Sequence, residues 1–184
     1  MVPMRTVTLT LTLLATVLLP STALAQNSTS FPLQMYRAAS VVALETGVPA
    51  FYVYSEWMEA PQANQVAVVA AVEQLGADYV YAARDPEVGF DCSGLIDYAW
   101  KEAGVDLPRT SRAQIRAVDT SVDDIEVGDL MYYPGHIMMY LGFGDFVIHA
   151  ANRQLDVVIS EVQRSTTTGA VMVPKPSVGT ARAF

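Results

Sequence analysis

The stretch GFDCSGLIDYAWKEAG, residues 89–104, decides most of what this sequence predicts about its fold. It holds Cys92, the only cysteine of the 184-residue chain, directly before apolar residues that recur at helical spacing. These apolar residues are Leu95, Ile96, Ala99, Trp100 and Ala103. The spacing predicts a helix with one buried face that ends at Gly104. With Asp91 or Ser93 as its N-cap, Cys92 lies in the first turn.

The position of this cysteine allows two interpretations. The free N–H groups and positive dipole end of a helix N-terminus favour a negative sulfur, so thiol pKa values are often lowered there. A solitary cysteine in an oxidising compartment also indicates a reactive thiol or a bridge between chains. The alternative is a buried cysteine that packs as a small apolar residue.

The N-terminal sequence predicts export. Exported proteins meet an oxidising compartment, where cysteines are usually paired. Arg5 precedes an apolar stretch from Val7 to Leu19, and Ala23-Leu24-Ala25 forms a small-residue cleavage site before Gln26. This pattern predicts a signal peptide over residues 1–25 and a secreted, periplasmic or cell-wall location. The apolar stretch is shorter than the roughly 20 residues of a membrane span, so we expect no membrane contact after cleavage.

Composition limits the classes of partner. The chain has 19 acidic and 11 basic residues, for a net charge of −8 that becomes about −9 when Arg5 is removed. Without a cluster of Lys or Arg, such a chain is not expected to bind nucleic acid or an anionic membrane. The roughly 159 remaining residues suffice for one domain that buries its own core. We expect a monomer.

Helical patterns come first along the chain and strand patterns follow. Helices are predicted from Pro32 to Gly47, from Gln62 to Gly76, and from Ser111 to Ala117, the last with a capping box of Ser111 and Gln114. Residues 47–61 are ambiguous, residues 78–83 favour a short strand, and residues 84–90 favour a loop. Strand patterns cover residues 127–134, 135–151, 155–162 and 170–176. This order predicts an α+β fold, an antiparallel sheet with its helices on one side.

The two histidines of the chain lie in neighbouring strand patterns. His136 and His149 flank the sequence GFGD, and the odd sum of their residue numbers matches an even-length hairpin loop. A two-residue type II′ turn at Gly142-Phe143 would place the two histidines directly opposite each other. Their Cβ atoms would then be roughly 5 Å apart on one face of the sheet.

One thiol and two imidazoles suggest two chemistries. Cys92 could be a nucleophile, with one histidine as its base and the other orienting that base. Alternatively, Cys92, His136 and His149 could bind zinc with an open fourth position. The first interpretation is preferred, and it expects no metal and no cofactor.

Five motifs in order resemble the NlpC-type cell-wall peptidases, a family of papain-like cysteine enzymes. The motifs are DCSGLI (91–96), LPRTS (107–111), GDLMYY (128–133), HIMMYLG (136–142) and IHA (148–150). The resemblance covers roughly residues 62–161. It implies cleavage of the γ-D-glutamyl to diamino-acid bond in peptidoglycan stem peptides. It also implies a papain-like domain over residues 62–174, between an N-terminal extension (26–61) and a tail (175–184).

The resemblance also implies roles for individual residues. Cys92 would be the nucleophile, His136 its base and His149 the orienting residue. Five residues would bind substrate: Tyr79, Asp91, Ser93, Arg109 and Ser111. In some family members the positions of Asp91 and Ser93 meet the free amino end of the stem peptide. A catalytically silent module that only binds peptidoglycan is the remaining alternative.

One departure from the family pattern lies just before the nucleophile motif. A pair of glycines is usual there, and this chain has Ala82-Ala83 instead. The departure affects the shape of the expected cleft and leaves the three catalytic residue types in place.

Overall fold

The centre of the molecule is a four-stranded antiparallel sheet, seen here in a computed structural model that describes residues 30–120, 125–162 and 174–176. Its strands, in spatial order, are β4 (Leu130–Tyr133), β5 (His136–Tyr140), β6 (Phe146–Ala150) and β7 (Val157–Glu161). The predicted signal peptide, most of the predicted tail and part of the strand predicted over 170–176 lie outside the described residues.

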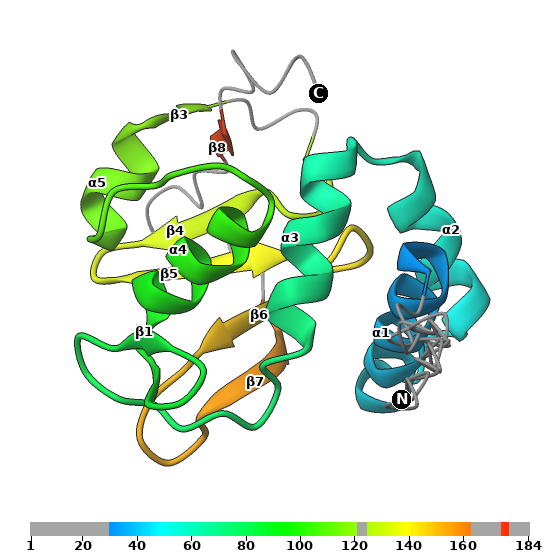
Figure 1. The fold of residues 1–184 in the computed structure, drawn as a ribbon, viewed down its shortest axis with the longest axis horizontal. Coiled ribbons are helices and arrows are strands. Elements are labelled where there is room, and N and C mark those ends of the chain that lie inside the picture. Colours follow the sequence, from blue (N-terminus) through cyan, green and yellow to red (C-terminus); the bar gives the residue numbers. More distant parts are fainter. Residues whose placement is uncertain (1–29, 121–124, 163–173, 177–184) are drawn as a thin grey trace, which may run out of the picture.

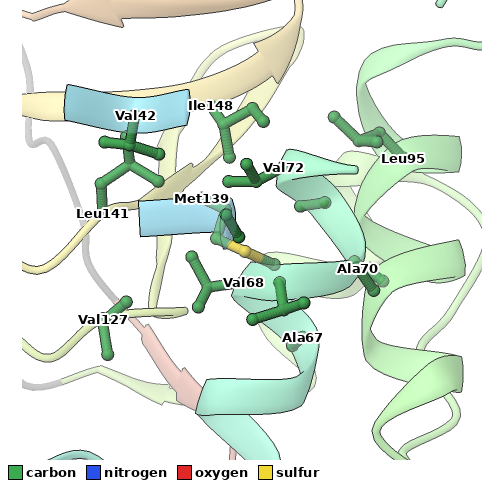
Figure 2. Close-up of a cluster of buried hydrophobic side chains, with 14 of the residues drawn as sticks. Val42, Ala67, Val68, Ala70, Val72, Leu95, Val127, Met139, Leu141 and Ile148 are labelled. Atoms are coloured by element: carbon green, nitrogen blue, oxygen red, sulfur yellow. The ribbon is translucent and has the colours of Figure 1, made fainter. Parts of the chain in front are cut away.

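Two helices form the layer that covers this sheet. Helix α4 (Cys92–Glu102) packs on β5 and β6, and α3 (Gln62–Val72) packs against α4 (Figure 1). Figure 2 shows Val68 of α3 beside Met139 and Val72 of α3 beside Ile148, all four within the main hydrophobic cluster. An antiparallel sheet with helices packed on it confirms the predicted α+β class.

The N-terminal helices α1 (Phe31–Thr46) and α2 (Ala50–Glu59) lie side by side beyond α3, on the opposite side of the molecule from α5 (Ser111–Arg116) (Figure 1). Helix α1 has a proline in its first turn and ends at Gly47, whose φ of 75° is left-handed. Helix α2 occupies the segment for which the sequence pattern was ambiguous. No helix of the described residues is long and apolar enough to cross a membrane.

Helix α2 is fixed to the sheet by a buried tryptophan. Trp57 has no exposed surface, and its Nε1–H donates to the carbonyl oxygen of Leu141 at 2.8 Å. Leu141 directly follows β5, so this bond joins α2 to the loop between β5 and β6. Residues 31–59 therefore pack against the rest of the fold.

Three local predictions differ from the structure. Residues 84–90 form a small hairpin of β1 (Arg84–Asp85) and β2 (Gly89–Phe90) rather than an irregular loop. Residues 78–83 form no strand, and Tyr79 makes only an isolated bridge to Phe90. Helix α5 is capped by Thr110, which accepts from the Ala113 N–H, so the capping box predicted one residue later is wrong.

Two short strands, β3 (Val118–Thr120) and β8 (Pro174–Pro176), pair beside the main sheet.

The predicted turn between β5 and β6 is also wrong. The strands pair Met139 with Ile148 and Tyr140 with Val147, which leaves a four-residue loop at 142–145 rather than a two-residue turn. Gly142 has a φ of 90°, a conformation that β-carbons disfavour. Extending this register places His136 and His149 as diagonal neighbours on one face, not directly opposite each other.

Candidate active site

Cys92 is the first residue of α4, as the sequence predicts. Of the two N-cap candidates, Asp91 is the cap, because its side chain accepts from the Gly94 N–H at 2.7 Å. A Cβ on Gly94 would lie 2.0 Å from the carbonyl oxygen of Ala83. Only glycine therefore lets the start of α4 approach this segment so closely. The cysteine is partly exposed and unpaired.

The environment of the sulfur raises its pKa, contrary to the lowered pKa expected at a helix N-terminus. Burial is the largest cause, and the charge of Asp91 acts in the same direction. Hydrogen bonds to the sulfur from the backbone of Ile137 and Ser93 lower the pKa without offsetting the burial. Cys92 is therefore a neutral thiol at pH 7. The hydrogen bond from the backbone of Ile137 places the sulfur beside β5, at the residue that follows His136 in the chain.

The two histidines contact each other despite the different hairpin register. Nε2 of His136 and Nδ1 of His149 are 2.6 Å apart, and the rings meet edge to face with centroids 4.9 Å apart. Since Nε2 of His136 is occupied, Nδ1 is its remaining ring nitrogen. On the other side, Nε2 of His149 lies 3.0 Å from Oγ of Ser160. Sequence reasoning missed Ser160, although it lies in a predicted strand.

Both imidazoles are neutral at pH 7. Burial lowers the pKa of His136 below its ordinary value. Burial, and then the charge of His136, lowers the pKa of His149 to about 4. A neutral imidazole has a free lone pair, so His136 can accept a proton from a neighbouring thiol.

Asp91, Ser93 and Arg109 form one hydrogen-bonded network at the start of α4. Arg109 binds both carboxylate oxygens of Asp91, through Nη2 to Oδ2 at 2.7 Å and Nη1 to Oδ1 at 3.0 Å. Its Nη1 also donates to Oγ of Ser93 at 2.9 Å, and this hydroxyl donates to Oδ1 of Asp91. Burial alone would raise the pKa of Asp91, but the hydrogen bonds from Arg109 and the Gly94 N–H lower it overall.

The other two residues expected to bind substrate differ in position. Tyr79 is close enough to Cys92 for the sulfur to raise its pKa, after the larger effect of burial. Its backbone N–H is held by Oδ1 of Asp156 at 2.9 Å. Ser111 is the first residue of α5, and within the described ranges no hydrogen bond joins it to Asp91, Ser93 or Arg109. The structure thus brings four of the five residues together near Cys92.

Tyr133 is a second residue that sequence reasoning missed. It pairs with His136 across β4 and β5, and the two rings stack with centroids 5.1 Å apart and a tilt of 34°. Burial and the nearby sulfur raise its pKa. Its place at the end of a strand, three residues before a histidine, is the signal that could have identified it.

Comparison with known proteins identifies the family of this chain. Residues 76–174, more than half of the chain, match the model of the NlpC/P60 family. The chain belongs to the NlpC/P60 family. Its fold is therefore the papain-like α+β fold that the sequence motifs imply.

Similar proteins of this family have been named or solved. A protein of Corynebacterium glutamicum (strain R) named "Probable endopeptidase" is 38% identical over 104 residues, which are 53% of this chain and 48% of that protein. The chain spans about half the length of the curated relatives it matches. The P60 domain of an antigen from M. avium subspecies paratuberculosis is 28% identical with a TM-score of 0.54, over 62% of this chain and 95% of that one.

A second solved structure of this family is described as non-catalytic. RipD from Mycobacterium tuberculosis is 26% identical, with a TM-score of 0.54 over 63% of this chain and 98% of that one. Its structure is described as a non-catalytic NlpC/p60 domain protein adapted to a peptidoglycan-binding function. Domains with the NlpC/P60 fold therefore include catalytic and binding proteins, which differ in the side chains of the site.

The histidine geometry of this NlpC/P60 domain fits a hydrogen bond better than a shared metal. Two nitrogens bound to one tetrahedral zinc at about 2.0–2.1 Å lie well over 3 Å apart. Nε2 of His136 and Nδ1 of His149 are 2.6 Å apart. Within the described ranges, no group of three or more His, Cys, Asp or Glu side chains has the arrangement of a metal site. The arrangement therefore favours the thiol and imidazole chemistry.

Proposed function

We propose that this domain is a cysteine peptidase that hydrolyses the γ-D-glutamyl to diamino-acid bond of peptidoglycan stem peptides. The observation that carries the proposal is the position of Cys92, at the start of α4 and beside β5, where His136 is hydrogen-bonded to His149. Membership of the NlpC/P60 family, and relatives named as endopeptidases, support the reaction class.

The proposed reaction begins from a neutral thiol and a neutral imidazole. Nδ1 of His136 takes the proton of Cys92 as the sulfur attacks the carbonyl carbon of the scissile amide. Backbone N–H groups in the first turn of α4 stabilise the oxyanion. His136 then gives its proton to the leaving amine, and the C–N bond breaks to leave a thioester.

Water completes the cycle. His136 takes a proton from the water as its oxygen attacks the thioester carbonyl, and the sulfur leaves and regains a proton. In both steps, Nδ1 of His149 accepts a hydrogen bond from the Nε2–H of His136. This bond keeps the lone pair on Nδ1 of His136, where it is available to the thiol. We propose catalytic roles for Cys92 and His136 and a positioning role for His149.

The proposed setting of the enzyme follows from the sequence. We propose cleavage of a signal peptide after residue 25, action at the cell wall as a monomer, and a peptidase domain over residues 62–174. The extension at 26–61 would then reach the domain through the packing of α1 and α2, with Trp57 as its anchor.

A binding module is the second candidate, because the NlpC/P60 domain of RipD is described as non-catalytic. The assembled set of Cys92, His136 and His149 favours catalysis over this alternative. The two candidates differ in whether product is released.

Digestion of defined muropeptides, followed by mass spectrometry, tests the proposal. Wild-type protein should release two fragments from the γ-D-glutamyl bond, whereas Cys92→Ala should release none and keep a native circular dichroism spectrum. Iodoacetamide should abolish activity and a metal chelator should not. Equal turnover by Cys92→Ala and wild type would refute the cysteine mechanism. Binding without product would support the binding module.

A further inference from the structure

Resting on the proposed function, we propose that Tyr133 is a positioning residue for the reaction. Its aromatic ring packs on the imidazole of His136 and holds this base in the orientation that proton transfer from Cys92 requires. The role belongs to the ring of Tyr133 and does not need its hydroxyl.

A short turn places Tyr133 on His136. Only Pro134 and Gly135 separate β4 from β5, and Tyr133 pairs directly with His136 across the two strands. Directly opposed residues of an antiparallel pair project to the same face of the sheet, with their β-carbons close together. Proline fixes the backbone of one of the two turn residues, so the register next to the base is rigid.

The contact covers a flat face of the imidazole. The ring centroids of Tyr133 and His136 are 5.1 Å apart and their planes are tilted by 34°. His149 instead meets His136 through an edge, at an interplanar angle of 76°. Only 8% of His136 is exposed, against 48% of Tyr133. The tyrosine ring therefore contributes to the burial of the base and holds it from a direction different from that of His149.

The hydrogen bond to His149 leaves one rotation of the His136 side chain weakly restrained. The χ2 torsion of a histidine has a broad energy profile, so its surroundings must select the plane of the ring. Nε2 lies close to the Cβ–Cγ axis of this rotation, and Nδ1 lies farther from it. A hydrogen bond at Nε2 therefore restrains the ring plane less than a ring packed on the flat face. The position of Nδ1, which the proposed reaction uses, then depends on Tyr133.

Tyr133 is also close to the nucleophile. The sulfur of Cys92 raises the pKa of Tyr133, after the larger effect of burial. The tyrosine hydroxyl is thus a second group that could act on the reacting atoms. Tyr133→Phe separates the two contributions, because it keeps the ring and removes the hydroxyl.

Steady-state kinetics on a defined muropeptide tests the inference. We expect Tyr133→Ala to lower kcat about three- to tenfold with little change in KM, the scale of one aromatic contact expressed as a rate. Tyr133→Phe should keep the wild-type kcat.

Tyr52→Ala is the matched control. Tyr52 of α2 is 47% exposed and meets one aromatic ring, Phe143, at a centroid distance of 6.3 Å. Phe143 follows the end of β5 opposite to His136. Tyr52→Ala should therefore keep the wild-type kcat.

The pKa of His136, measured by NMR titration, is a readout that a general loss of stability would not change. His149 of β6 and Tyr133 of β4 contact the imidazole, and Cys92 at the start of α4 lies beside the next residue of β5. Burial lowers the pKa of His136 from 6.5, so Tyr133→Ala should raise it towards that value. Tyr133→Phe should leave it unchanged.

The possible results separate this inference from the proposed function. A folded Tyr133→Ala variant with the wild-type kcat would overturn the inference and leave the proposed function intact. Equal losses in Tyr133→Phe and Tyr133→Ala would also overturn it, because the hydroxyl would then be the active group. If Tyr133→Ala does not fold, Tyr133→Leu, which keeps apolar bulk without a flat ring, is compared with Tyr133→Phe instead. If wild-type protein cleaves no muropeptide, the proposed function is wrong and this inference is wrong with it.

Discussion

Nε2 of His149 lies 3.0 Å from Oγ of Ser160, so a hydroxyl on β7 ends the hydrogen-bonded series that begins at His136. When His136 acts as the base, its Nε2–H donates to His149, whose own Nε2–H must then donate to Ser160. With Oγ of Ser160 as the acceptor of this N–H, Nδ1 of His149 keeps its lone pair for His136, and Nδ1 of His136 keeps its lone pair for the thiol.

Ser160→Ala should lower kcat about tenfold with little change in KM, because the Nε2–H of His149 loses its acceptor and the imidazole is no longer held in the orientation that His136 needs. Ser160→Thr, which keeps the hydroxyl, should restore most of the rate. Steady-state kinetics measures the effect, and ¹⁵N NMR of the imidazoles should show a mixed tautomer population for His149 in the alanine variant. An unchanged kcat and tautomer ratio would contradict this role.

The rate should depend on pH through His136. Burial lowers the pKa of this imidazole below 6.5 in the fold, so it stays neutral and able to accept a proton down to a lower pH than an ordinary histidine. We expect kcat/KM to rise through a pKa below 6.5 and to remain high through pH 8, because the pKa of the Cys92 thiol is raised. If kcat/KM rose with a midpoint above pH 7, this would contradict a neutral Cys92 thiol and a neutral His136 imidazole as the active form.

Stability should fall on acidification because of His149. Its pKa is about 4 in the fold and about 6.5 when unfolded, so the unfolded chain binds more protons between these pH values. The free energy of unfolding should therefore decrease from pH 6.5 to pH 4, with His149 contributing on the order of 2–3 kcal/mol. Urea unfolding at several pH values measures the slope. His149→Gln should reduce the slope of the free energy of unfolding against pH. An identical slope in that variant would show that other groups cause the pH dependence.

Ala82→Gly should stabilise the protein. Ala82 has a φ of 64°. This left-handed conformation costs roughly 1 kcal/mol of stability in a residue with a β-carbon, and little in glycine. We expect a gain of about 0.5–1 kcal/mol in the free energy of unfolding. Ala83→Gly is the matched control, since Ala83 has no positive φ, and it should destabilise by a similar amount. Chemical denaturation compares the two, and a loss of stability in Ala82→Gly would count against strain at this position.

Trp57→Phe should destabilise the protein by about 1–3 kcal/mol, because the carbonyl of Leu141 loses its buried donor. Trp57→Ala should cost about 3–5 kcal/mol, since it also leaves a cavity. The exposed Phe51 of the same helix provides the control, and Phe51→Ala should change stability by less than about 0.5 kcal/mol. Equal unfolding midpoints for Trp57→Phe and wild type would show that this bond does not fix α2.

Features that depend on neighbouring residues follow from the amino-acid sequence alone. Apolar spacing predicted the helix behind Cys92 and its buried face, and a short polar residue before it provided the cap. The order of helical patterns followed by consecutive strand patterns predicted the antiparallel sheet. Periodicity, capping and the order of elements are all properties of the chain before it folds.

How distant residues meet depends on the folded structure. The four-residue loop at 142–145 set the register of β5 and β6, and a sequence pattern cannot choose between loops of equal parity. Folding brought Ser160 to His149 and Arg109 to Asp91, contacts between residues 11 and 18 positions apart. It also raised the pKa of Cys92 instead of lowering it, because desolvation depends on everything that packs around the sulfur, and a helix N-terminus supplies only part of that environment.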